Sequence, residues 1–113
     1  MIYIVLPYPP PTNRLWRNWR GRTVLSTEAR AYKAKVRAAA GGTAGPIKGP
    51  ISISIWVYRP RKSGDLDGRI KAVLDALQGV AYVDDSQVVS LHAYRFDDKA
   101  SPRVEVEVRS AET

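Results

Sequence analysis

Hydrophobic residues along the chain either alternate with polar ones or recur at helical spacing, and these two periods divide the chain into elements. The apolar, β-branched run at 2–6 predicts a first strand, closed by the prolines that follow it. The strict alternation of "ISISIWVY" at 51–58 predicts a second strand with one buried face. Residues 88–96 and the alternating "RVEVEVR" at 103–109 predict a third and a fourth.

Two other stretches have the period of a helix. After a possible N-cap at Ser26 or Thr27, the apolar positions of residues 27–40 fall on one face, and the pattern stops at the glycines 41–42. The second helix is predicted from about Leu66 to Gln78, ended by Gly79. Its apolar residues stand at i, i+3, i+4 and i+7: Ile70, Val73, Leu74 and Leu77.

The resulting order is β-α-β-α-β-β, which predicts an α+β fold. We expect one domain over residues 1–113, because 113 residues leave little room for a second core. In that domain a mixed four-stranded sheet is covered by the two helices.

Composition narrows the functional classes. The chain has no cysteine, which excludes disulfides, Cys-ligated zinc and thiol catalysis. No apolar run is long enough to span a bilayer, and the N-terminus lacks the features of a signal peptide, so a cytoplasmic protein with no membrane partner is expected. The formal charge is +7 and the pI about 10.0, which favours DNA or RNA as the partner over an anionic membrane.

The acidic residues are unevenly placed. Between Asp65 and Asp85, five acids face two bases, a local charge of −3 that leaves +10 for the rest of the chain. Asp65 and Asp67 stand at the start of the second helix, where two carboxylates can hold Mg²⁺ while several waters remain for a phosphate substrate. Lys71 follows one turn later, positioned to neutralise phosphate charge. Asp84 and Asp85 come after the helix, and the chain can bring one of them back beside the first two.

A purely structural interpretation of the same residues stays open. Acids near a helix N-terminus interact favourably with the helix dipole, and Asp67 with Lys71 is also the spacing of a surface ion pair. The pair Asp84 and Asp85 is equally compatible with an ordinary turn. His92, the only histidine, has no acidic neighbour at metal-ligand spacing and is interpreted as structural.

Basic residues gather in two segments. The first interleaves arginines with Trp16 and Trp19, so that phosphate contact and base stacking compete with a solvated loop held by two buried tryptophans. The second lies directly before the acidic stretch and suggests a phosphate clamp. The candidate DNA-binding residues, with one more from the second helix, are Arg14, Arg17, Arg20, Arg22, Arg59, Arg61, Lys62 and Arg69.

Several motifs in this order resemble the RusA family of Holliday junction resolvases. They are "LPYPPPTNRLWR", "GRTVLSTEARAYK", a basic loop, "DLDGRIKAVLDAL" and "VDDSQV", and they run from Leu6 to about Val89. The combination of D-x-D, a following Lys, D-A-L and D-D-x-Q is specific. One departure is Gly68, where the family usually has Asn.

The resemblance implies a homodimeric, Mg²⁺-dependent endonuclease of bacteria or phages, with Mn²⁺ as a candidate substitute and no small-molecule cofactor. Such an enzyme nicks four-way DNA junctions symmetrically in recombination and repair, leaving 5′-phosphate and 3′-hydroxyl ends. The family's catalytic residues fall on Asp65, Asp67, Lys71 and Asp85, the three acids being the metal ligands. Asp84 is either the third metal ligand in place of Asp85 or a residue that contacts the ligands without binding the metal.

Two other functions are compatible with the sequence. One is a non-catalytic basic DNA-binding module with the same fold, to which Gly68 gives some support. The other is a small RNA-binding or ribosome-associated protein, which the pI favours and the clustered acids disfavour.

Overall fold

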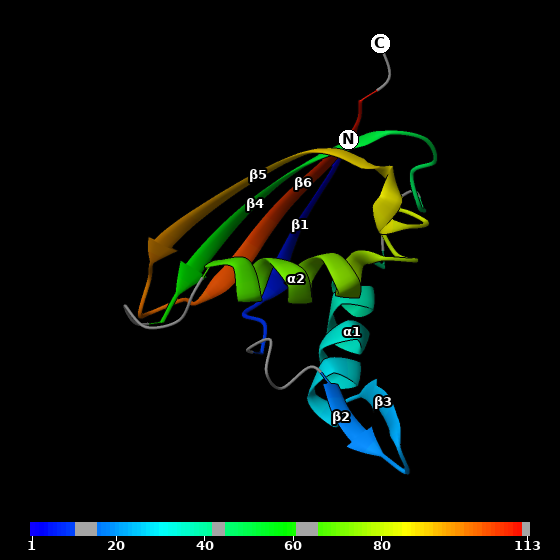
Figure 1. The fold of residues 1–113 in the computed structure, drawn as a ribbon. Coiled ribbons are helices and arrows are strands. Elements are labelled where there is room, and N and C mark those ends of the chain that lie inside the picture. The colour runs from blue at the N-terminus through cyan, green and yellow to red at the C-terminus, as the bar shows by residue number, and fades with distance from the viewer. Residues whose placement is uncertain (11–15, 42–44, 61–65, 112–113) are drawn as a thin grey trace.

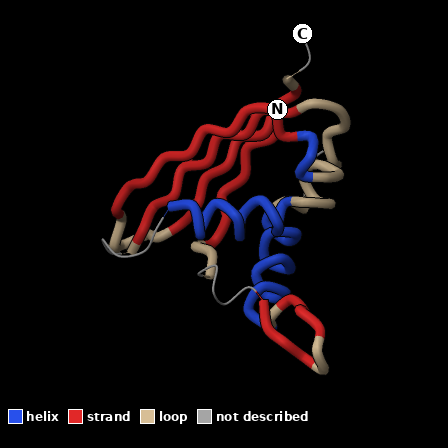
Figure 2. The backbone as a smooth tube through the Cα atoms, viewed as in Figure 1, coloured by secondary structure: helices blue, strands red, loops and turns tan. Residues whose placement is uncertain are grey.

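A computed structural model describes residues 1–10, 16–41, 45–60 and 66–111 of the chain. Four strands form one sheet in the order β1-β6-β4-β5, and only the β4–β5 pair is parallel (Figures 1 and 2). The strands are β1 (Ile2–Pro7), β4 (Ile51–Arg59), β5 (Val88–Asp97) and β6 (Arg103–Ser110), and the helices are α1 (Thr27–Ala39) and α2 (Leu66–Leu77). The predicted α+β fold, a mixed four-stranded sheet with two helices, is confirmed.

The core lies between the sheet and the two helices. Alternation puts one side of every strand inward, and the inward residues Ile51, Ile53, Ile55 and Val57 of β4 are at most 1 % exposed. Valines of β6 and the apolar face of α2 pack into the same cluster. Both helices lie on one side of the sheet, and in the described parts of the chain no helix covers the other side (Figure 1).

The two helices are also joined by a polar contact. The Ser26 side chain caps α1 by accepting a hydrogen bond from the Ala29 amide at 3.1 Å, which is one of the two predicted caps. One turn further along α1, the Lys33 ammonium donates to the carbonyls of Asp75 and Gln78 at 3.2 and 2.8 Å. A lysine at these last carbonyls stabilises the C-terminal end of α2. Lys33 therefore supports the helix from the end opposite Asp67.

A two-stranded hairpin precedes α1 and was not predicted. Its strands are β2 (Trp16–Trp19) and β3 (Arg22–Leu25), and it lies beyond the N-terminal end of α1, away from the sheet (Figure 1). The connecting residues Arg20 and Gly21 both have positive φ, 51° and 76°, as in the two-residue turns that match strand twist. The glycine at 21 indicated a turn, but strands of four residues are too short to show a period in the sequence.

Neither helix is long and apolar enough to cross a bilayer, a statement that covers the described ranges of the chain.

Candidate active site

The helix α2 positions the first part of the site. Its buried residues Ile70 and Val73 face the core, which turns Lys71 outward, where its side chain is 54 % exposed. The Lys71 ammonium lies 3.6 Å from the Asp75 carboxylate one turn along. Asp67 is the second residue of α2, but its side chain and the whole of Asp65 lie outside the described residues.

The segment after α2 folds back beneath the helix and brings the second part of the site to it. Gly79 adopts a φ of 83°, which allows the chain to reverse immediately after the last turn. Tyr82 is fully buried, and its hydroxyl donates a 2.6 Å hydrogen bond to the Leu74 carbonyl. Burial raises the pKa of Tyr82, and the nearby negative charges of Asp85 and Asp75 raise it further. The tyrosine therefore anchors the return segment beside α2.

The adjacent aspartates that follow have different environments. Asp84 caps the short 3₁₀ helix η2 (Asp85–Gln87): its carboxylate accepts from the Ser86 amide at 3.2 Å and from the Ser86 hydroxyl. These bonds hold the pKa of Asp84 below its ordinary value. The Asp85 carboxylate has no hydrogen-bond or ion-pair partner among the residues that the structure describes, and it lines a cavity with Lys71. This arrangement favours Asp85 over Asp84 as the third metal ligand, because the Asp84 carboxylate is already used in the cap.

Gln87 fixes the loop that carries both aspartates. Its side-chain oxygen accepts from the amides of Val83 and Asp84, both at 2.8 Å. Its nitrogen donates to the carbonyls of Ile47 and Gly49 at 2.9 and 2.8 Å. One amide side chain therefore satisfies two donors and two acceptors, and ties the aspartate loop to the segment before β4. The sequence motif D-D-x-Q contains this residue, but its link to the segment before β4 could not be predicted because Ile47 and Gly49 lie about 40 positions away.

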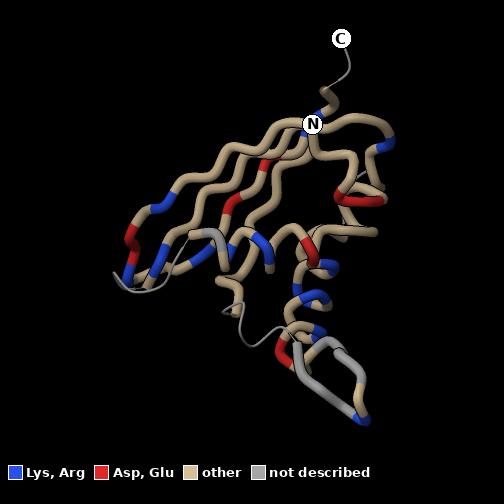
Figure 3. The backbone as a smooth tube through the Cα atoms, in the orientation of Figure 1, with Lys and Arg blue, Asp and Glu red and all other residues tan. Residues whose placement is uncertain are grey.

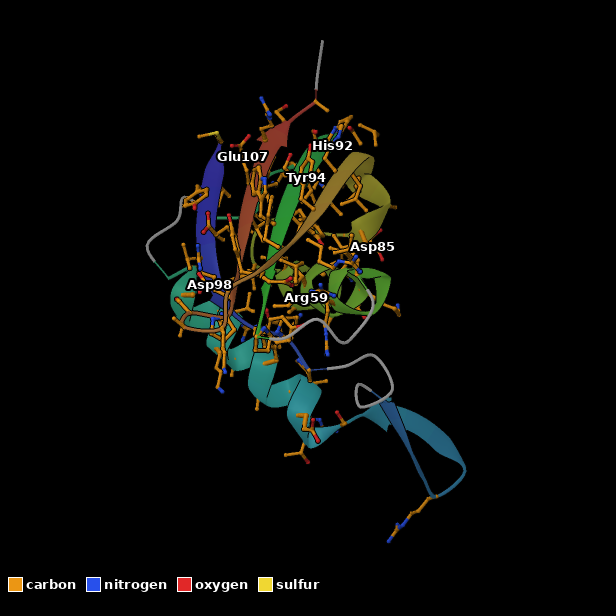
Figure 4. All side chains as sticks on the ribbon, turned by 90° about the vertical axis from the view of Figure 1, so that its left-hand side faces the viewer. Arg59, Asp85, His92, Tyr94, Asp98 and Glu107 are labelled. Carbon is orange, nitrogen blue, oxygen red and sulfur yellow. The ribbon has the colours of Figure 1, made fainter. Side chains whose placement is uncertain are left out.

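The cavity occupies about 370 Å³ between α2 and β5. Its polar groups are those of Lys71, Asp75 and Asp85, and its walls are the apolar side chains Leu66, Ile70, Leu74, Leu91 and Ala93. Asp85 is labelled beside the ribbon of α2 in Figure 4, in agreement with the shared lining of the cavity. Low-polarity walls strengthen the interaction of charges at the rim with a bound phosphate or cation.

The oxygen atoms that line the cavity include part of the ligand set that a hard divalent cation needs. Carboxylate oxygens are the ligands that Mg²⁺ prefers, and Asp85 supplies one at the cavity. No cluster of three acidic or histidine residues occurs within the described residues. The complete predicted set includes Asp65 and Asp67, whose carboxylates are not described, so the three-ligand site stays a prediction.

The predicted DNA-binding arginines have different positions. Arg20 is exposed at the tip of the β2–β3 hairpin, where a basic residue appears at the far end of the molecule in Figure 3. The backbone of Arg17 lies in β2 and that of Arg22 in β3, but their side chains are outside the described set, as are Arg14, Arg61 and Lys62 altogether.

Arg59 and Arg69 make contacts inside the protein instead. Arg59 is only 9 % exposed and forms a 2.7 Å ion pair with Asp97, an arrangement that disfavours the predicted phosphate contact. Arg69 donates to the Pro9 carbonyl at 3.2 Å and lies over the Tyr8 ring, 5.0 Å from its centroid. It joins α2 to the proline-rich segment after β1, and this structural contact also argues against the DNA-binding assignment.

His92 is not a core residue. It is exposed on β5, and its Nε2 lies 3.0 Å from the Ser90 hydroxyl. The contact is local to β5, and the interpretation of His92 as a structural residue stays a prediction.

Comparison with known proteins identifies the relatives of this chain. The sequence model of the family described as "Endodeoxyribonuclease RusA" matches residues 7–109. A crossover junction endodeoxyribonuclease of Enterobacteria phage 82 is 36% identical over 110 residues, 94% of this chain and 92% of the relative. The corresponding proteins of Shigella sonnei and Escherichia coli K12 are each 35% identical over 109 residues, 93% of this chain and 91% of theirs. The chain belongs to the RusA family of endodeoxyribonucleases.

Proposed function

We propose that this chain is a Mg²⁺-dependent endodeoxyribonuclease that resolves four-way DNA junctions by paired symmetric nicks, in recombination and repair. The observation that carries the proposal is the meeting of Asp85 and Lys71 at one cavity beside the start of α2, in a member of a nuclease family. The relatives named above are crossover junction endodeoxyribonucleases.

Asp65, Asp67 and Asp85 would hold the metal, which when bound supplies charge stabilisation at the scissile phosphate and a water of lowered pKa. The Lys71 ammonium would stabilise the additional negative charge that develops on the phosphate oxygens. Asp75 keeps that ammonium near the cavity through its 3.6 Å contact. Gln87 and the cap formed by Asp84 hold the loop so that the Asp85 carboxylate faces the cavity.

A homodimer completes the proposal. A four-way junction has approximate two-fold symmetry, so a two-fold dimer presents one site to each of two opposed strands. The excess of positive charge outside the segment 65–85 attracts the DNA backbone, and the acidic segment binds the cation that the reaction needs.

The test uses a synthetic four-way junction with Mg²⁺. We expect paired nicks with 5′-phosphate ends from the wild-type chain, and a loss of roughly 100-fold or more in Asp67→Asn, because a metal supplies several kcal/mol of transition-state stabilisation. Junction binding should persist in that variant. Asp98→Asn is the matched control, since Asp98 lies in the β5–β6 turn and its carboxylate accepts hydrogen bonds from Ser101 and Arg103 at the same turn.

Two outcomes would overturn the proposal. Tight junction binding without cleavage at any Mg²⁺ or Mn²⁺ concentration would identify a non-catalytic binding module. A preference for RNA over junction DNA would identify an RNA-binding protein. Binding of Mn²⁺ measured by electron paramagnetic resonance, weakened in Asp67→Asn but not in Asp98→Asn, tests the metal site without reference to activity.

A further inference from the structure

The strand β5 carries an arginine directly beyond the wall of the cavity. β5 is an edge strand of the sheet, and its alternate residues face the side on which the helices lie. Leu91 and Ala93 are on that side and line the cavity. Arg95 is the next residue on the same side: it is paired in the register with Val57 of β4, which is buried, and Arg95 itself is exposed.

Arg95 also lies at the end of the sheet where α2 begins. β4 and β5 are parallel, and β4 ends two residues after Val57, from where the chain turns back to start α2 at Leu66 (Figure 1). Leu66 lines the cavity together with Ala93. Two residues of a strand span about 6.6 Å, and a DNA strand advances about 3.4 Å along the duplex for each phosphate. Arg95 is therefore one or two nucleotides away from the cavity.

The positive charge of Arg95 is not neutralised within the described parts of the chain. The adjacent acid on the same side of β5 is Asp97, but its carboxylate lies 2.7 Å from Arg59. The neighbour of Arg95 across the sheet, Val57, is apolar. Arg95 has no hydrogen-bond or ion-pair partner among the residues that the structure describes. The ion pair of Arg59 thus takes up the nearby carboxylate and leaves the Arg95 guanidinium available to a ligand.

The side of the sheet opposite the helices, which we call the outer sheet face, uses its arginines differently. Its outward residues on β6 are Arg103, Glu105, Glu107 and Arg109. Arg103 pairs with Glu105 at 2.8 Å, and Arg109 pairs with Glu107 at 3.0 Å. Paired charges of this kind do not attract a polyanion, whereas an uncompensated arginine does. The charge of Arg95 is therefore not a general property of arginines on this sheet.

We propose that Arg95 binds the DNA phosphate that lies one or two nucleotides from the phosphate to be cut. The inference rests on the proposed function, because it takes the cavity of Lys71 and Asp85 as the place of cleavage. The strand would follow β5, with its sugars against the apolar wall formed by Leu66 and Leu91. A guanidinium can donate two parallel hydrogen bonds to one phosphate, which fixes the position and direction of the backbone. Arg95 is thus a positioning residue and contributes no sequence preference of its own.

The first experiment measures binding of a synthetic four-way junction without divalent metal, so that the result does not depend on cleavage. Arg95→Gln should weaken binding roughly 10-fold and reduce the slope of log affinity against log salt concentration by about 1, as expected for one lost phosphate contact. Lys99→Gln is the matched control. It removes the same charge from an exposed residue of the β5–β6 turn, four positions further along, and should bind within about two-fold of wild type.

The second experiment locates the contact on the DNA. The nick made by the wild-type chain is mapped, and single phosphates within two nucleotides of it are replaced by uncharged methylphosphonates. At one position the replacement should weaken wild-type binding roughly 10-fold and weaken binding of Arg95→Gln less than two-fold, because the variant already lacks the partner of that phosphate. Thermal denaturation should be the same for both proteins, since Arg95 makes no described contact within the fold.

The possible failures are distinguishable. Wild-type affinity and salt slope in Arg95→Gln would overturn this contact, and junction cleavage by the wild-type chain would leave the nuclease proposal standing. Equal losses in Arg95→Gln and Lys99→Gln would show attraction by net charge alone and also contradict the contact. Methylphosphonates that weaken both proteins equally at every position would place the arginine away from the cut phosphate. Binding that depends on Arg95 in a chain that cuts no junction would overturn the nuclease function and support the phosphate contact.

Discussion

The outer sheet face and the α2–η2 region differ in how their charged side chains are used. On the sheet, Arg103 bonds to Asp98 at 2.9 Å and to Glu105 at 2.8 Å, so its charge is neutralised within the fold. Beside α2, the Asp85 carboxylate has no partner among the described residues, and Lys71 has only a 3.6 Å contact with its neighbour on the helix. The first set of charges completes a surface. The second set is available to a ligand, which is the physical distinction between a structural cluster and a site.

The largest expected effect is a difference in activity between variants of Asp85, the first residue of η2, and of Asp84, its N-cap. Asp85→Asn should lower junction cleavage by roughly 100-fold or more with thermal stability unchanged, because it removes the carboxylate charge at the cavity. Asp84→Asn should retain most of the activity, since an asparagine can still cap η2. The measurement is single-turnover cleavage of a four-way junction at saturating Mg²⁺. An equal loss in both variants, or a larger loss in Asp84→Asn, would remove the distinction drawn here between the two residues.

A smaller but broader effect is expected at Gln87. Gln87→Leu removes four hydrogen bonds, and at about 1 kcal/mol net for each the free energy of unfolding should fall by about 2–4 kcal/mol. The loop that presents Asp85 should also loosen, so Mn²⁺ affinity should fall roughly 10- to 100-fold, as for other residues that orient metal ligands. The readouts are urea denaturation and Mn²⁺ titration followed by electron paramagnetic resonance.

The chain's other glutamine provides the control. Gln78→Leu makes the same substitution at the end of α2, where the backbone carbonyl and not the side chain receives the Lys33 ammonium. It should leave Mn²⁺ affinity within about two-fold of wild type. If Gln87→Leu lowers stability and leaves Mn²⁺ affinity unchanged, Gln87 is a structural residue and does not position Asp85.

Two strands of the sheet, β4 and β6, and both helices could be predicted from the sequence because each has a regular period. The positions 51–58 and 103–109 alternate strictly, and the apolar positions of residues 27–40 bury as the helical spacing predicts. The hairpin β2–β3 escaped prediction since four-residue strands carry too little pattern. The sheet order also escaped it, because nothing local to β6 indicates that it lies between β1 and β4.

The residues of the candidate site could be predicted from the sequence, but the partners of the surrounding basic side chains could not. Resemblance to a family gave Asp85 and Lys71, and the structure brings both to one cavity. The sequence does not show which basic side chains are already bound within the protein. Arg59 and Arg69 were therefore assigned to DNA, although Arg59 pairs with Asp97 and Arg69 donates to the Pro9 carbonyl. A basic residue near an acidic stretch looks the same in sequence whether its partner is a phosphate or a carboxylate 38 positions away.

The smallest expected effect is the pH dependence of the sheet cluster. Hydrogen bonds from Tyr3 and then Arg103 hold the pKa of Glu105 below its ordinary 4.5, and Arg103 holds the pKa of Asp98 below its ordinary 3.8. Because both pKa values are lower in the folded chain, the stabilisation is complete above the ordinary values and is lost as the pH falls through the lowered ones. The melting temperature should therefore fall below about pH 4.5. Arg103→Met should reduce that fall by roughly 1–3 °C, a small change because exposed ion pairs contribute little. Arg109→Met, on the same strand and face, is the control and should keep the wild-type slope between pH 3 and 6. An unchanged slope in Arg103→Met would mean that the cluster does not contribute to acid sensitivity, and that the charges of the outer sheet face are no more coupled to the fold than those beside α2.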